Sequence, residues 1–153
     1  MDVSQLVRGR EPITSWPEQR VDAAARLMTE HNIGAVPVME DGRVAGMLSE
    51  RDVSRALGVH GGSLGELRVR DLMTVEVVCC RSGASLQEAM ELMERHHIRH
   101  LPVLDPGRRL LGVISQRDVL ASLLAAVKAD TVAERERLLL EKVRSMKGTS
   151  GPL

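Results

Sequence analysis

Residues 46–53, Gly-Met-Leu-Ser-Glu-Arg-Asp-Val, return later in the chain as residues 112–119, Gly-Val-Ile-Ser-Gln-Arg-Asp-Val. The stretches before them also correspond. Residues 24–33 match residues 89–98, and Val-Pro-Val at 36–38 matches Leu-Pro-Val at 101–103. The matches keep their order across the whole stretch, with one extra residue in the turn near Pro106. The sequence therefore contains one structural unit written twice.

Each copy predicts the same series of elements. Apolar residues at helical spacing indicate a helix that starts near Val21 or Ser85, and Ser85 followed by Glu88 is typical of a capping box. A second helix is predicted from Glu50 or Gln116, after two short strands joined by a turn. A leading strand precedes each first helix, so the unit is β-α-β-β-α. The predicted strands are residues 11–15, 35–39, 43–48, 76–80, 100–104 and 109–114.

Four segments follow from this pattern. We expect a first repeat with its lead-in at 1–62, a second repeat at 63–125, a C-terminal helix at 126–147 and a disordered tail at 148–153. The glycine-bearing stretch 58–65 is predicted to be a mobile loop between the repeats. An apolar stripe on the C-terminal helix indicates packing on its own domain or on a dimer partner rather than on a membrane. That stripe consists of Val132, Leu139, Val143 and Met146.

Composition argues against several functions. The 21 basic and 21 acidic residues cancel, whereas nucleic-acid-binding proteins usually carry a basic excess. With no Phe, no Tyr and one Trp, any bound base must be held between aliphatic side chains. The adjacent Cys79 and Cys80 are expected to be reduced. With no apolar leader and no membrane-length apolar run, we expect a cytoplasmic protein without a membrane partner.

The element Ser-x-Arg-Asp stands at a predicted strand-to-helix junction in both copies, as Ser49 to Asp52 and as Ser115 to Asp118. One interpretation is structural, because serine and an acid three residues later cap a helix start. The other is a ligand site. A carboxylate can accept both hydroxyls of a ribose, a helix N-terminus favours an anion, and arginine suits a phosphate. The pattern alone leaves both interpretations open.

These motifs resemble the CBS domain family, whose repeats usually occur in pairs. The resemblance rests on residues 33–38 with 46–52, on residues 98–103 with 112–118, and on the lead-in Val-Arg-Asp-Leu-Met-Thr at 69–74. It implies an α/β (α+β) fold of tandem repeats packed about a pseudo-two-fold axis. It also implies clefts between the repeats that bind AMP, ADP or ATP, and in some members NAD(H) or S-adenosylmethionine. Such pairs commonly form homodimers.

The resemblance also implies which side chains line two clefts. Ser49, Asp52, Ser115 and Asp118 would bind ribose, and Arg51, Arg99, His100 and Arg117 would bind phosphate. The first cleft would hold adenine with Met47, Val77, Val78, Ile98 and Pro102. The second would use Ile13, Thr14, Ile33, Gly34, Ala35, Pro37 and Val113. Because Arg99 and His100 are assigned to the first cleft only, the Asp52 cleft is predicted to bind phosphate better than the Asp118 cleft.

The leading hypothesis is a non-enzymatic sensor that signals to a regulated partner protein in trans. No P-loop, nucleophile elbow or metal triad supports a nucleotide-hydrolysing enzyme. A ligand-free adaptor or dimerisation protein, with the Ser-Asp pairs acting only as caps, stays open. The cluster His96, His97 and His100 lacks the further ligands that a metal site needs, so no metal is expected.

Overall fold

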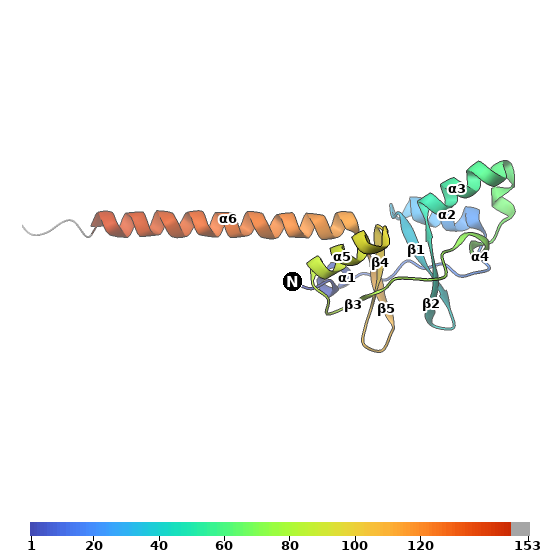
Figure 1. The fold of residues 1–153 in the computed structure, drawn as a ribbon, viewed down its shortest axis with the longest axis horizontal. Coiled ribbons are helices and arrows are strands. Elements are labelled where there is room, and N and C mark those ends of the chain that lie inside the picture. Colours follow the sequence, from blue (N-terminus) through green and yellow to red (C-terminus); the bar gives the residue numbers. More distant parts are fainter. Residues whose placement is uncertain (148–153) are drawn as a thin grey trace, which may run out of the picture. The chain divides into compact units, whose positions relative to one another are not determined.

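The computed structural model describes residues 1–147, and their side chains as far as residue 145. The chain divides into two compact units, Met1–Val119 and a second that begins at Leu120. The first unit contains two small sheets, ordered β1-β2 and β3-β4-β5, together with short helices (Figure 1). The fold is therefore the mixed α+β class with two copies of one unit, as predicted. The disordered tail predicted at 148–153 lies outside the described residues.

The helices and strands follow the order predicted from the repeat, with three differences. Three short helical segments are added, residues 11–15 form no strand, and the helix predicted from Gln116 continues without a break through the C-terminal helix predicted at 126–147. The helices and strands are α1 (Ser4–Val7), α2 (Val21–Glu30), β1 (Ala35–Glu40), β2 (Arg43–Ser49), α3 (Glu50–His60), η1 (Gly61–Glu66), α4 (Val69–Leu72), β3 (Cys80–Arg81), α5 (Leu86–His96), β4 (His100–Leu104), β5 (Leu110–Ser115) and α6 (Gln116–Lys147).

The two hairpins confirm the predicted turns. β1 and β2 pair antiparallel, as do β4 and β5, and each pair carries a bulge at the equivalent place. Asp41 and Gly42, between β1 and β2, both have positive φ angles, of 51° and 74°. Two consecutive positive φ angles match the twist of a two-residue hairpin, and Asp-Gly adopts them readily. Ser85 and Glu88 form the predicted capping box at α5.

The two leading strands are shorter than predicted. Residues 11–15 contribute one bridge, between Ser15 and Val38, and residues 76–80 contribute only Cys80, as part of β3. Pro12 and Pro17 flank Ser15, and proline lacks the amide hydrogen that a ladder requires. A strand also needs a neighbouring edge along its whole length, and β4 pairs with only Cys80 and Arg81.

The stretch 58–65 is helical rather than a loop. α3 continues to His60, where Gly61 ends it with a φ of 54°, and the 3₁₀ helix η1 follows directly. Short 3₁₀ segments are common connectors at helix ends. The glycines therefore mark a change of helix type, which composition alone did not reveal.

Each lead-in helix packs against the other repeat. Thr74, just after α4, exchanges backbone hydrogen bonds with Met47 of β2, at 2.9 and 3.0 Å. A Cβ on Gly46 would lie 2.7 Å from the Met73 sulfur, and one on Gly112 would lie 2.8 Å from Cγ1 of Val7. Glycine at both positions allows this close approach. The packing of each lead-in segment on the opposite repeat joins the two repeats into one compact unit.

Apolar side chains of the first repeat and of the lead-in helix α4 together fill the core of the first repeat. Met28 of α2 and Val36 and Leu48 of the hairpin are buried together with Val69 of α4. Cys80 is buried as well, and burial raises the pKa of both cysteine thiols. Both cysteines are free.

The second unit consists of α6 from Leu120 onward. Val132, Leu139 and Val143 of the predicted apolar stripe are each about half exposed or more, and the side chain of Met146 lies outside the described part. Within residues 1–147, no helix combines the length and the apolar character needed to cross a bilayer. The four segment boundaries predicted from the sequence stay predictions.

Candidate functional site

Two cavities lie in the first unit, and each is lined by residues of both repeats. The smaller cavity has a volume of about 500 Å³ and the larger about 1120 Å³. Ligand pockets for small molecules usually have volumes of 300 to 1,000 Å³. The smaller cavity therefore falls within that range, and the larger one slightly exceeds it.

The smaller cavity brings together nine of the ten residues assigned to the first cleft. They are Met47, Ser49, Arg51, Asp52, Val77, Val78, Ile98, Arg99 and His100. The exception is Pro102, which is buried in β4 opposite Val113 and does not line the cavity. Val77 and Val78 belong to the extended segment before β3, whose half-buried side chains face the cavity instead of entering a sheet.

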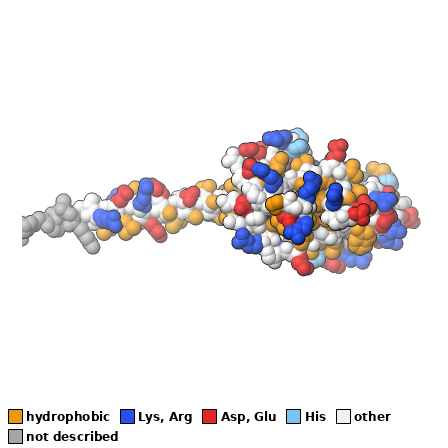
Figure 2. Space-filling model, turned by 90° about the horizontal axis from the view of Figure 1, so that it is seen from below, with side chains coloured by type: hydrophobic (Ala, Val, Ile, Leu, Met, Phe, Trp, Pro, Cys, Tyr) orange, Lys and Arg blue, Asp and Glu red, His pale blue; other side chains and the backbone are white. Residues whose placement is uncertain are grey.

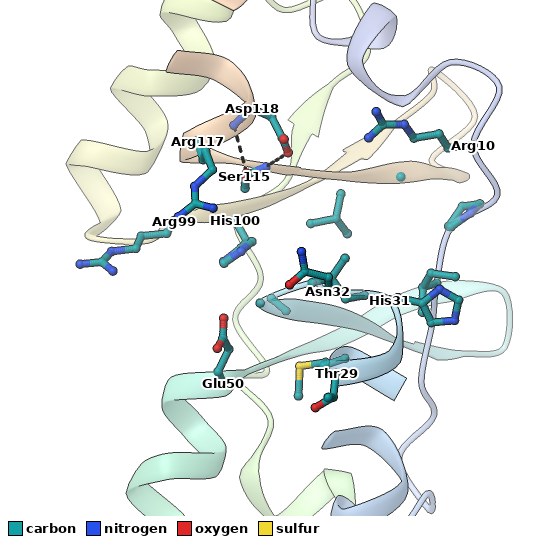
Figure 3. Close-up of a pocket in the computed structure, with 18 of the residues that line it drawn as sticks. Arg10, Thr29, His31, Asn32, Glu50, Arg99, His100, Ser115, Arg117 and Asp118 are labelled. Carbon is teal, nitrogen blue, oxygen red and sulfur yellow. Dashed lines mark hydrogen bonds between the residues drawn. The ribbon is translucent and has the colours of Figure 1, made fainter. Parts of the chain in front are cut away.

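The larger cavity brings together eight of the ten residues assigned to the second cleft (Figure 3). They are Ile13, Ile33, Gly34, Ala35, Val113, Ser115, Arg117 and Asp118. Thr14 and Pro37 do not line this cavity. Pro37 is buried in β1, and Thr14 directly precedes Ser15, which bridges to Val38 of that strand. Adjacent positions of an extended chain face opposite sides, so membership of a motif does not make each residue a wall.

Both Ser-Asp pairs form capping boxes. The amide of Asp52 donates to Ser49 Oγ at 3.2 Å, and the amide and hydroxyl of Ser49 donate to Asp52 Oδ2 at 2.8 and 2.9 Å. In the second repeat, the amide of Asp118 donates to Ser115 Oγ at 3.1 Å, and that of Ser115 donates to Asp118 Oδ2 at 2.9 Å. Among the described residues, every hydrogen bond to these carboxylates goes to Oδ2. Each carboxylate keeps Oδ1 available to a ligand.

A second pair of backbone bonds positions the helix starts. The amide of Glu50 donates to the Gly34 carbonyl at 3.0 Å, and the amide of Gln116 donates to the Arg99 carbonyl at 2.8 Å. Gly34 and Arg99 are equivalent residues just before β1 and β4. The bonds therefore hold each helix start beside the residue that precedes the first hairpin strand of its own repeat.

The distribution of basic residues differs from the sequence prediction. Arg99 and His100 line both cavities, so the assignment of this pair to one cleft is wrong. Arg10 also lines the larger cavity, where it lies opposite Arg117 and His100 (Figure 3). The sequence could not place Arg10, because it belongs to an irregular segment with no counterpart in the repeated motif. Glu50 is a further residue that sequence reasoning missed, and it lines both cavities.

Burial is the main influence on His100. It lowers the pKa of the imidazole, Arg99 lowers it further, and the carboxylates of Glu50 and Asp118 act in the opposite direction. A histidine with a lowered pKa is neutral at pH 7, so it offers one ring N–H donor and one acceptor.

The described residues do not gather three or more metal-ligating side chains at one place. His96 and His97 lie at the end of α5, where His97 has a left-handed φ of 53° and its amide caps the helix by donating to Glu94 and Met93. A left-handed residue at this position is a common way to end a helix.

Comparison with known proteins extends this picture. The CBS domain matches the chain twice, at residues 3–59 and 69–125. The chain belongs to the CBS domain family. It is 38% identical over 106 residues to the CBS domain-containing protein YhcV of Bacillus subtilis, a match that covers 69% of this chain and 74% of that protein. These matches confirm the family resemblance and the tandem arrangement.

Solved CBS proteins have the same fold. A putative signal-transduction protein with CBS domains from Burkholderia ambifaria superposes with a TM-score of 0.75 at 35% identity, covering 82% of this chain and 95% of that one. The chain is also 36% identical over 110 residues to the inosine-5'-monophosphate dehydrogenase of Korarchaeum cryptofilum. That match covers 72% of this CBS chain but only 22% of the enzyme, so it extends to a small part of the dehydrogenase.

Proposed function

We propose that this CBS pair is a non-enzymatic regulatory module that binds an adenine nucleotide in the cavities between its repeats. One observation carries the proposal. In each cavity an acid at a helix start, Asp52 or Asp118, lies together with aliphatic residues of both repeats and with Arg99 and His100. A nucleotide site needs three parts: an acceptor for the ribose hydroxyls, aliphatic walls around the base, and hydrogen-bond donors to the phosphate.

Each part has a named role in this proposal. Asp52 and Asp118 accept the ribose hydroxyls through Oδ1, while Oδ2 continues to cap the helix. Arg51 and Arg117 act on the phosphate of their own cavity, together with Arg99 and His100. The half-buried side chains of Met47, Val77, Val78 and Ile98 enclose the base in the smaller cavity.

Proteins of this fold provide a precedent. CBSX2 was crystallised with AMP, and the CBS pair of MJ0100 with 5'-methylthioadenosine and S-adenosylmethionine. Both are less than 25% identical to this chain, so the likeness concerns the fold. AMP, ADP, ATP, NADH and S-adenosylmethionine are therefore the compounds to test.

Signalling follows from linkage. A ligand that contacts both repeats favours the arrangement of repeats that it binds best, and only this difference in affinity can drive a change. The proposal includes a homodimer and a protein partner that responds in trans. Charged side chains of both signs alternate over the face seen in Figure 2, which favours a protein or small-molecule partner over nucleic acid.

The test combines calorimetry with a matched control. Asp52→Ala removes a cap and a proposed ribose acceptor, whereas Asp71→Ala removes only a cap. Asp71 accepts from the Arg68 amide at 2.8 Å to cap α4 and lines neither cavity. We expect AMP to bind wild type and Asp71→Ala alike and Asp52→Ala at least about tenfold more weakly, because charged hydrogen bonds contribute about 1.5 to 3 kcal/mol each. Equal binding by all three would refute the ribose role.

A ligand-free adaptor is the second candidate, and the two complete capping boxes favour it. In that case Ser49, Asp52, Ser115 and Asp118 act only on the helices. Thermal unfolding with each of the five compounds separates the candidates, because a ligand that binds the folded state raises the melting temperature. No shift with any of them would support the adaptor, and turnover of a nucleotide would support an enzyme.

A further inference from the structure

The two cavities share a wall. Gly34, Ala35, Glu50, Arg99 and His100 line both of them, and we call these five residues the shared wall. The shared wall combines equivalent positions of the two repeats, Gly34 just before β1 and Arg99 just before β4. The carbonyl of each accepts a hydrogen bond from the first residue of the helix that follows the hairpin, Glu50 of α3 or Gln116 of α6.

The shared wall is tightly packed at Gly34. A Cβ there would lie 2.5 Å from Oε1 of Glu50 and 3.0 Å from Nε2 of His100. The carboxylate and the imidazole thus occupy the space that a side chain at Gly34 would need. In Figure 3, Glu50 points toward His100 from below while Arg117 approaches from above. A ligand phosphate in either cavity would meet the same few groups.

The shared wall carries little positive charge to divide between two ligands. Arg99 and Glu50 have opposite charges, and burial lowers the pKa of His100 so that its ring is neutral at pH 7. Each cavity adds two arginines of its own, Arg51 and Arg55 in the smaller cavity and Arg10 and Arg117 in the larger. A neutral imidazole has one N–H, so it can donate to a phosphate on one side at a time.

We propose that the two cavities are antagonistic for phosphate-bearing ligands, so that a nucleotide in one cavity lowers the affinity of the other. This inference rests on the proposed nucleotide-binding function. The antagonism has two sources: competition for Arg99 and His100, and repulsion between two anions across the shared wall. It is reciprocal, because coupling between two binding sites is symmetric. Uncharged adenosine, which has no phosphate, experiences neither effect.

Glu50 strengthens the antagonism. Its equivalent in the second repeat is the neutral Gln116, so the negative charge on the shared wall comes from one repeat only. Glu50→Gln would leave a net positive shared wall facing both cavities. We expect this variant to bind AMP more tightly in both cavities and to show weaker antagonism. Glu11→Gln and Glu76→Gln are the matched controls, because Glu11 lines only the larger cavity and Glu76 only the smaller.

The experiment closes one cavity at a time without changing charge. Val78 lines only the smaller cavity and Val113 only the larger, and both are half-buried. Val78→Trp and Val113→Trp fill the cavity that each residue lines. Calorimetric titration with AMP then compares the binding isotherm of the wild type with the sum of the isotherms of the two single-cavity variants. Two independent cavities would make the wild-type isotherm equal to that sum.

We expect the second AMP to bind the wild type at least about fivefold more weakly than it binds the variant in which the other cavity is closed. Adenosine should bind the wild type as the sum of the two variants. An AMP isotherm equal to that sum would overturn the antagonism while leaving the proposed function intact. Failure of the wild type to bind adenosine and all five compounds, AMP, ADP, ATP, NADH and S-adenosylmethionine, would instead overturn the proposed function. Should either tryptophan variant fail to fold, Asp52→Ala or Asp118→Ala replaces it.

Discussion

The Asp52 cavity and the Asp118 cavity are built from equivalent motifs, yet they differ in size and exposure. Asp52 is half-buried in a cavity of about 500 Å³, whereas Asp118 is exposed at the edge of one of about 1120 Å³. The larger cavity also receives Arg10 from the N-terminal segment. A repeated motif therefore preserves the chemistry at the helix start, while unrepeated neighbours decide how closely a ligand is enclosed.

Replacing the two aspartates should change AMP affinity more than any other substitution. We expect Asp52→Ala to weaken AMP binding at least about tenfold and Asp118→Ala by only a few-fold, since a hydrogen bond is stronger where water is excluded. The sequence-based reason for this ranking, exclusive possession of Arg99 and His100, does not apply, because both cavities contain them. Calorimetry on both variants measures the ranking. Equal losses would show that enclosure does not separate the cavities.

The capping serines give the next effect. Ser49 Oγ both accepts from the Asp52 amide and donates to Asp52 Oδ2, whereas the described bonds of Ser115 Oγ include only the accepted one. We expect Ser49→Ala to reduce the free energy of unfolding by about 1 to 2 kcal/mol and Ser115→Ala by about 1 kcal/mol. Urea unfolding measures both, with Ser85→Ala at α5 as a cap outside the cavities. A larger loss for Ser115→Ala would contradict this ranking.

Acidification tests the shared wall. The pKa of His100 is lowered in the free protein, mainly by burial, and a bound phosphate would raise it again. The complex then takes up a proton, so AMP affinity should rise about threefold as pH falls from 8 toward 6. Glu50, Asp118 and Arg99 are the charged groups that act on this ring. The phosphate of AMP also titrates in this pH range, and the His100→Gln variant retains that contribution. An equal pH dependence of AMP affinity in this variant would therefore show that protonation of His100 is not its cause.

The smallest effect concerns Gly34. Gly34→Ala places a methyl group against Glu50 and His100, and we expect AMP affinity to fall by about twofold in both cavities. Glu50 is exposed and can move, so stability should change little. Gly83→Ala is the control, since a Cβ at Gly83 meets nothing within 4 Å. A change confined to one cavity would mean that the shared wall does not act on both.

Local pattern was a reliable guide to local structure. Helical and alternating periodicity predicted α2, α5 and both hairpins, because each of these elements depends on neighbours in sequence. The leading strands and the stretch 58–65 were less well predicted. Whether an extended run becomes a strand depends on a partner edge, which is a tertiary property.

The amino-acid sequence was enough to predict the duplicated unit, its main elements and the Ser-Asp pair at each helix start. Folding in three dimensions was needed to show that α1 and α4 pack on the opposite repeat and that Arg99, His100 and Glu50 line both cavities. The same holds for Arg10, which lines the larger cavity. The difference comes from distance along the chain. A capping box spans four residues, whereas a cavity wall joins side chains many residues apart, and no local periodicity records that proximity.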